Sequence, residues 1–206
     1  MNDLPPEIRH MPIDPRRNLP IPFINERIDG VANFAVLDPR RAAVCYSKRL
    51  CAMCGLKMGA EVALYGDVVS LEPDGFYIEA PVHERCMVIA LGGLCPFISS
   101  ETYPRRRADD PEVAVLGDRE KLRQVGRTIA KRPAIVVIAR RYQMANLVTP
   151  DGMMPVYLVP ASEVVRVRRF AWVDGRAREV LADEPVPEPR RVVRVQPRRQ
   201  PRRKRR

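Results

Sequence analysis

Four side chains that commonly bind metal ions occur in this sequence as two closely spaced pairs. Cys51 and Cys54 belong to a C-x2-C-G segment that ends at Gly55, and His83 and Cys86 form an H-x2-C segment 28 residues further along. Structural zinc sites take four thiolate or imidazole ligands in a tetrahedron, commonly as two such pairs. A glycine after the first pair lets the backbone turn away from the ion. The spacing predicts a closed, structural Zn²⁺ site.

Two further cysteines compete for a place in this site. Cys95, followed by proline, could replace His83 and give a four-cysteine site, whereas Cys45 precedes Cys51 on a predicted helix and is interpreted as a packing residue. A simpler interpretation makes the four residues buried small hydrophobic groups and a core histidine. A redox dithiol is disfavoured, because that motif expects a βαβ setting.

Basic residues flank both pairs of predicted ligands. Three thiolates and one Zn²⁺ would leave the site with a charge of about −1. Lys48 and Arg49 precede the first pair, Lys57 follows it, and Arg85 lies within the second pair. We expect these cations to offset the charge of the site.

Turn and cap residues predict the elements that position the first pair. Asp29-Gly30 lies between apolar runs in residues 23–36, which indicates a hairpin. Asp38 followed by Pro39 is typical of a helix N-cap and first helical position. A helix over residues 39–49 would then lead the chain to Cys51.

A second helix is predicted to carry the second pair. Pro81 would begin it, so that His83 and Cys86 share one face, and Gly92-Gly93 would end it. Short strands are expected between residues 61 and 79, between the two pairs. The order of knuckle, β-hairpin and helix is that of a treble-clef zinc motif.

Residues 113–180 predict a second lobe that is rich in β-structure. Asp118 is a candidate N-cap of a helix that Pro133 ends. The continuous apolar run Ala134–Ala139 is typical of a buried strand. Residues 149–152 (TPDG) predict a turn, and residues 169–173 a last short strand.

These elements predict an α+β fold with four parts. Residues 1–22 form an extended proline-rich arm, and residues 23–100 form a small treble-clef-like zinc-binding lobe. A polar loop at 101–112 separates this lobe from an α+β lobe at 113–180. Residues 181–206 form a disordered arginine-rich tail.

The positive charge of the chain is concentrated in that tail. The whole chain has 36 basic and 25 acidic residues, and ten of the basic ones lie after residue 188, which leaves 26 against 25 for the remainder. Such a segment cannot build a core, and it binds nucleic acid by neutralising phosphates. The alternatives are a tail that only increases solubility, an acidic protein partner or an anionic membrane surface. The predicted nucleic-acid-binding residues are Arg190, Arg191, Arg194, Arg198, Arg199, Arg202, Arg203, Lys204, Arg205 and Arg206.

The residue types available disfavour catalysis. The chain has two histidines, of which His83 is a predicted ligand and His10 lies in the arm, so that neither suits a general base. We therefore expect a non-catalytic, zinc-stabilised protein that associates with nucleic acid through its tail. The alternatives are a protein-interaction factor and a degenerate His-Asn-His-type nuclease, a class with treble-clef folds. The start has no apolar leader and no apolar run is long enough to span a bilayer, so we expect a cytoplasmic protein without membrane insertion, with association with the nucleoid as one option.

The motifs also resemble those of a known group of proteins. They are P-I-P-F at 20–23, D-P-R-R at 38–41, C-x2-C-G at 51–55, P-x-H-x2-C at 81–86 and C-P-F at 95–97. In this order they are similar to an uncharacterised family of small zinc-knuckle proteins from bacterial genomes, prophages and bacteriophages. The resemblance covers about residues 8–180. It implies a zinc-binding fold and a phage or mobile-element origin, with a possible host protein as partner, although the arginine-rich tail replaces the acidic helical ending of that group.

Overall fold

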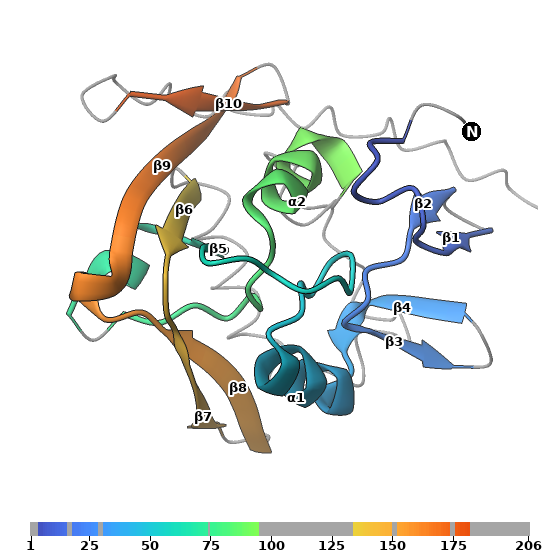
Figure 1. Cartoon of the computed structure of the whole chain (residues 1–206), viewed down its shortest axis with the longest axis horizontal. Helices are drawn as coiled ribbons and strands as arrows, with labels where there is room; N and C mark the ends of the chain where they lie inside the picture. The colour runs from blue at the N-terminus through green and yellow to red at the C-terminus, as the bar shows by residue number, and fades with distance from the viewer. Residues whose placement is uncertain are drawn as a thin grey trace, which may run out of the picture.

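Two helices and several antiparallel sheets form the described part of the chain, as the α+β prediction requires (Figure 1). This computed structural model describes residues 4–15, 18–28, 31–73, 75–94, 134–149, 152–173 and 176–181. The predicted loop at 101–112, the predicted helix from Asp118 and the tail at 182–206 lie outside these ranges. Within them, no helix combines the length and the apolar character needed to cross a bilayer.

The predicted hairpin and first helix are both confirmed. Strand β3 (Asn25–Ile28) pairs antiparallel with β4 (Val31–Leu37), and helix α1 (Pro39–Lys48) follows. Asp38 caps this helix, because its Oδ1 accepts hydrogen bonds from the backbone N–H groups of Arg40 at 2.9 Å and Arg41 at 3.3 Å. The helix ends at Arg49, whose left-handed backbone (φ 53°) turns the chain toward the first cysteine pair.

A four-stranded antiparallel sheet joins the two halves of the described chain. Its order is β10 (Arg176–Val180), β9 (Val164–Val173), β6 (Ala134–Ala139) and β5 (Val62–Gly66). Every residue of β6 is buried, which confirms the buried strand that the apolar run predicts. Strand β5 belongs to the segment predicted to form the zinc lobe, and β6 to the segment predicted to form the second lobe. The two segments therefore share one sheet.

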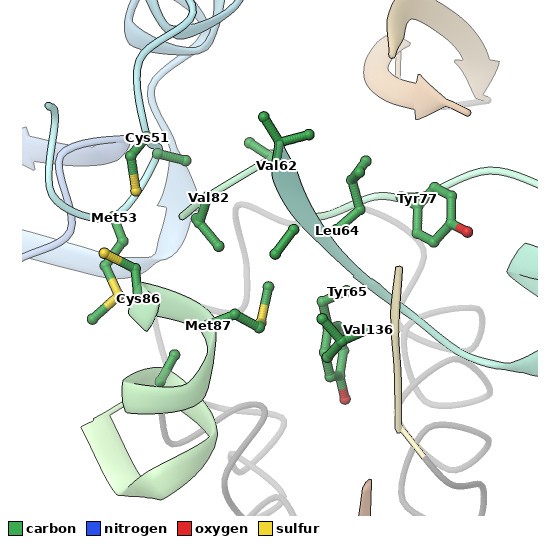
Figure 2. Close-up of a cluster of buried hydrophobic side chains, with 14 of the residues drawn as sticks. Cys51, Met53, Val62, Leu64, Tyr65, Tyr77, Val82, Cys86, Met87 and Val136 are labelled. Atoms are coloured by element: carbon green, nitrogen blue, oxygen red, sulfur yellow. The ribbon is translucent and has the colours of Figure 1, made fainter. Parts of the chain in front are cut away.

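They also share one hydrophobic core. The cluster of buried side chains includes Val62 and Leu64 of β5, Val136 of β6, and Met87 of helix α2 (Glu84–Ile89). Figure 2 shows these side chains together with Cys51 and Cys86, whose sulfur atoms lie at one end of the cluster. The cysteine pairs are thus part of the core and not an attachment to its surface.

A second hairpin projects from this sheet. Strand β7 (Gln143–Thr149) pairs with β8 (Gly152–Leu158), which is the arrangement that a turn at residues 149–152 predicts. The short 3₁₀ helices η1 (Val68–Leu71) and η3 (Ala161–Glu163) lie in the connections, and residues 90–94 continue α2 as a π-helical turn, η2 (Ala90–Leu94). Gly93 has a φ of 128°, in keeping with the glycine pair predicted to end this helix.

The N-terminal arm differs from the extended segment predicted from its prolines. Residues 5–11 form two consecutive turns, in which Ile8 N–H donates to the Pro5 carbonyl and Met11 N–H donates to the Ile8 carbonyl, both at 3.0 Å. A short pair of strands, β1 (Ile13–Asp14) and β2 (Leu19–Pro20), follows. Ile8 is fully buried, because the turns place it in the main core. The burial of apolar side chains outweighs the preference of proline-rich sequence for an extended chain.

Candidate metal centre

The first cysteine pair lies on a tight loop closed by backbone hydrogen bonds. Cys51 N–H donates to the Leu56 carbonyl and Gly55 N–H donates to the Cys51 carbonyl, each at 2.8 Å. Gly55 has a φ of +75°, which allows the chain to reverse at this point, as the sequence predicts. Cys54 N–H also points at Cys51 Sγ over 3.5 Å. The loop therefore turns both sulfur atoms to the same side.

The second pair is placed by the start of α2, and here the prediction needs a correction. The helix does not begin at Pro81, because Val82 pairs with Ala63 of β5 through hydrogen bonds of 2.8 and 2.9 Å that keep the chain extended. His83 is instead the N-cap residue, with φ −62° and ψ 146°, and Cys86 lies in the first turn. Both side chains still point to one side, and the Ala52 N–H bond to the Pro81 carbonyl (3.1 Å) holds the two segments together.

The four side chains converge on one point. Their ligand atoms, three Sγ atoms and one imidazole nitrogen, all lie within 4.8 Å of one another. Nδ1 of His83 is 3.3 Å from Cys54 Sγ and 3.8 Å from Cys86 Sγ. A tetrahedral Zn²⁺ with ordinary bond lengths separates a sulfur and a nitrogen ligand by about 3.6 Å. The two sulfur–nitrogen distances lie on either side of this value, so the four residues could bind a metal ion of that size.

Burial and oxidation state also suit metal binding. Cys51 and Cys86 are 0% exposed and Cys54 is 5% exposed. Each of these three cysteines is free, so no disulfide consumes a thiol of the cluster. Thiolates are soft ligands that select zinc and similar ions over calcium or magnesium.

A backbone carbonyl orients the imidazole of His83. Nε2 of this ring lies 3.2 Å from the Lys57 carbonyl oxygen. Because a carbonyl oxygen can only accept, Nε2 is the donor in this contact, and Nδ1 is the ring nitrogen that faces the sulfur atoms of Cys54 and Cys86. Such an outer contact to the second ring nitrogen is a general feature of histidines that bind metals.

Mutual hydrogen bonds divide the three thiols by acidity. The pKa of Cys54 is lowered, first by a hydrogen bond from the Cys51 thiol and then by one from Cys86. The pKa of Cys51 is raised, chiefly because it donates to Cys54, and that of Cys86 is raised, chiefly by its hydrogen bond with Cys51. The three thiols thus lie within hydrogen-bonding reach of one another, and a bound cation would replace these contacts.

The flanking arginines make other contacts than those expected from the sequence. Arg85 forms an ion pair with Glu7 at 2.7 Å. Arg49 donates to the carbonyls of Gly59, Ala60 and Arg140 over 2.8 to 3.1 Å. Arg49 therefore ties the exit of the loop to the end of β6, and its role is to hold the chain around the cluster.

A contact that sequence reasoning missed comes from the N-terminal arm. Nε2 of His10 lies 2.8 Å from the Cys54 carbonyl oxygen. The two residues are 44 positions apart, and no local pattern connects them. The histidine that the sequence assigned to a loose arm therefore hydrogen-bonds to the backbone of the cysteine loop.

The other predicted residues divide into two groups. Cys45 is buried on α1, where burial raises the pKa of its thiol to about 11, which agrees with a packing role. Cys95 lies outside the described residues, as do Arg190, Arg191, Arg194, Arg198, Arg199, Arg202, Arg203, Lys204, Arg205 and Arg206.

Comparisons with protein-family models, curated proteins and solved structures find no match to this chain. The resemblance to small phage and bacterial zinc-knuckle proteins remains a prediction from the motifs. The fold and the site define the class as an α+β protein with a cluster of three buried cysteines and one half-buried histidine that could hold a metal ion.

Proposed function

We propose that the cluster holds one structural Zn²⁺ in a treble-clef-like arrangement and that the protein is a non-catalytic, nucleic-acid-associated factor. The observation that carries the zinc assignment is the approach of three thiols and one oriented imidazole to within 4.8 Å. The order of elements supports the treble-clef comparison. A cysteine loop supplies the first pair, β5 and Val82 pair next to it, and the N-cap and first turn of α2 supply the second pair.

A structural role follows from the closed ligand set. Four protein ligands fill a tetrahedral zinc site and leave no position for water or substrate, whereas catalytic zinc keeps one open. Both histidines of the chain already interact with the cysteine loop or the cluster. His83 lies in the cluster, and the ring of His10 hydrogen-bonds to the Cys54 carbonyl. Neither ring is placed to serve as a general base, which supports a non-catalytic role over a nuclease.

Association with nucleic acid is proposed from the distribution of charge. Arg166 and Arg168 of β9 form ion pairs with Glu84 of α2, and Arg168 also pairs with Glu179 of β10 at 2.7 Å. Their charges are neutralised within the folded body, whose overall balance is already close to zero. The ten cations of residues 189–206 therefore provide the charge available for phosphates. Reduced thiols suit a cytoplasmic setting.

The experiment is a salt titration of binding to labelled duplex DNA and to RNA. The full chain should lose affinity steeply with salt, with a slope of log K against log[salt] of up to about −9 for duplex DNA if all ten charges engage phosphates. A chain truncated after residue 188 should lose most of the binding while keeping its zinc. The matched control replaces the nine tail arginines with lysine, which conserves the charge and should conserve binding. Binding that is unaffected by the truncation would refute the tail as anchor.

A further inference from the structure

The hairpin of β7 and β8 has two outer edges, and the backbone shows which residues face outward on each. The two strands pair over seven residue positions without a register shift. Tyr157 of β8 uses both its N–H and its C=O to bond Tyr77, at 2.8 and 2.9 Å, so its backbone groups point away from β7. In an antiparallel pair, residues with outward backbone groups alternate and lie opposite each other. Hence Met144, Asn146 and Val148 of β7 direct their backbone groups away from β8.

The outer edge of β8 is protected against further pairing. Tyr157 is already bonded to Tyr77, and Pro155, the next outward position, has no N–H to donate. Proline at an outward position of an edge strand is one of the devices by which proteins block strand addition. The hairpin thus terminates cleanly on this side.

The outer edge of β7 has none of these devices. Its seven residues, QMANLVT, include no charge and no proline, and its pairing with β8 has no bulge. Within the described ranges, none of the three outward positions makes a backbone hydrogen bond to another segment. The adjacent apolar side chains Leu147 and Val148 are 37% and 80% exposed. A regular, uncharged edge of this kind is a template for pairing with another strand.

We propose that this edge pairs with β7 of a second copy of the chain. Antiparallel pairing about Asn146 would place Asn146 opposite its own copy and Met144 opposite Val148 of the copy. The outward positions are apolar, polar and apolar in either direction along the strand. Apolar residues of one copy therefore face apolar residues of the other, the two Asn146 side chains face each other, and no like charges are brought together. Two hairpins joined in this way form a four-stranded sheet, whereas a two-stranded hairpin by itself is only marginally stable in water. Figure 1 shows the hairpin extending away from the main sheet.

The test is the mass of the full chain in solution, measured by sedimentation equilibrium at high salt after nuclease treatment. The wild type should reach twice its 23.4 kDa as its concentration rises into the high micromolar range. Asn146→Lys and Asn146→Glu should each be monomeric, because each places like charges opposite one another at the symmetry axis. An equimolar mixture of the two variants should recover the dimer, because it places opposite charges there.

A matched control separates the edge from general effects of charge. Gln143→Lys adds the same charge to β7 at an exposed position whose backbone faces β8, and the proposed register places it opposite Thr149 of the copy. This variant should dimerise as the wild type does, and all variants should keep the wild-type circular dichroism. A wild type that stays monomeric at millimolar concentration would overturn the proposal. A dimer that survives Asn146→Lys, or a mixture that fails to restore association, would also overturn it.

Discussion

Removal of the proposed zinc ion should unfold both halves of the described structure together. The three cysteines of the cluster are at most 5% exposed and belong to the same hydrophobic cluster as β5, β6 and Phe170 of β9. Once the ion is gone, their charges can be relieved only by protonation or by opening this core. Because β5 pairs directly with β6, opening the cysteine side removes one edge of the main sheet.

The expected size of the effect is comparable to or larger than the whole stability of an ordinary domain. A structural zinc contributes an apparent binding free energy of about 10–16 kcal/mol in small peptides at neutral pH. Single domains are stable by about 5–15 kcal/mol in total. We therefore expect the chelated protein to show no cooperative thermal transition, and Cys54→Ser, which removes one of four ligands, to behave in the same way.

The single tryptophan of the chain makes this assay specific. Trp172 lies on β9, in the half of the sequence that contains none of the four predicted ligands, and it packs against the shared core. The measurement combines zinc content by elemental analysis, tryptophan emission and a thermal melt before and after chelation. If the core is one unit, zinc loss should shift the emission of Trp172 to the red as the melting transition disappears.

The control is another buried cysteine that lies outside the cluster. Cys45→Ala should retain one zinc per chain and a cooperative melt, although the loss of a buried side chain lowers the stability by about 1–2 kcal/mol. A chelated sample with an unchanged melting curve would refute the structural role of the metal. An unchanged Trp172 emission in a sample whose cysteine half has unfolded would refute the single core.

Two further predictions concern residues around the cluster. Gly55→Ala should lower the free energy of unfolding, measured in urea, by about 1–2 kcal/mol, because the φ of +75° disfavours a side chain and the new Cβ would lie 2.8 Å from Phe23 Cδ2. Gly59→Ala is the control. Its new Cβ would have no atom within 4 Å, so this substitution should be nearly neutral. Arg168→Gln should weaken the acid dependence of stability, because the hydrogen bond from Arg168 is the main cause that lowers the pKa of Glu179 in the folded state. A carboxyl whose pKa is lower in the folded than in the unfolded state stabilises the fold at pH values above its unfolded pKa of about 4.3. This stabilisation is lost as the pH falls through the folded pKa. Stability measured from pH 6 downward at equal zinc content should fall less in the variant, and an equal fall in both proteins would contradict the assignment.

Local sequence signals predicted several elements correctly. Asp38 and Pro39 defined the start of α1, because capping and proline geometry act within one turn. The apolar run Ala134–Ala139 identified a buried strand, because only a strand covered on both faces lacks polar positions. The four members of the cysteine–histidine cluster were predicted from their spacing alone, since ligand pairs must be close in sequence to aim at one point.

Structural features that depend on contacts between distant residues were missed or placed at the wrong residue. The start of α2 was placed too early, because the pairing of Val82 with Ala63, which keeps the chain extended, joins residues far apart in sequence. The arm was predicted to be extended, yet Ile8 reaches the core and His10 bonds to Cys54. No periodicity or motif carries information about such pairings.

The sequence by itself determined which residues could bind a metal, where the chain turns, and where its charge lies, because side-chain chemistry and short-range backbone geometry are properties of neighbouring residues. Only the tertiary structure decided that β5 and β6 share a sheet and that the cysteines lie within the core. It also decided that, among the described residues, the outer edge of β7 has no backbone partner, whereas Pro155 and Tyr77 protect that of β8. These features depend on which distant segments exclude water from each other, and that choice is made by the chain as a whole.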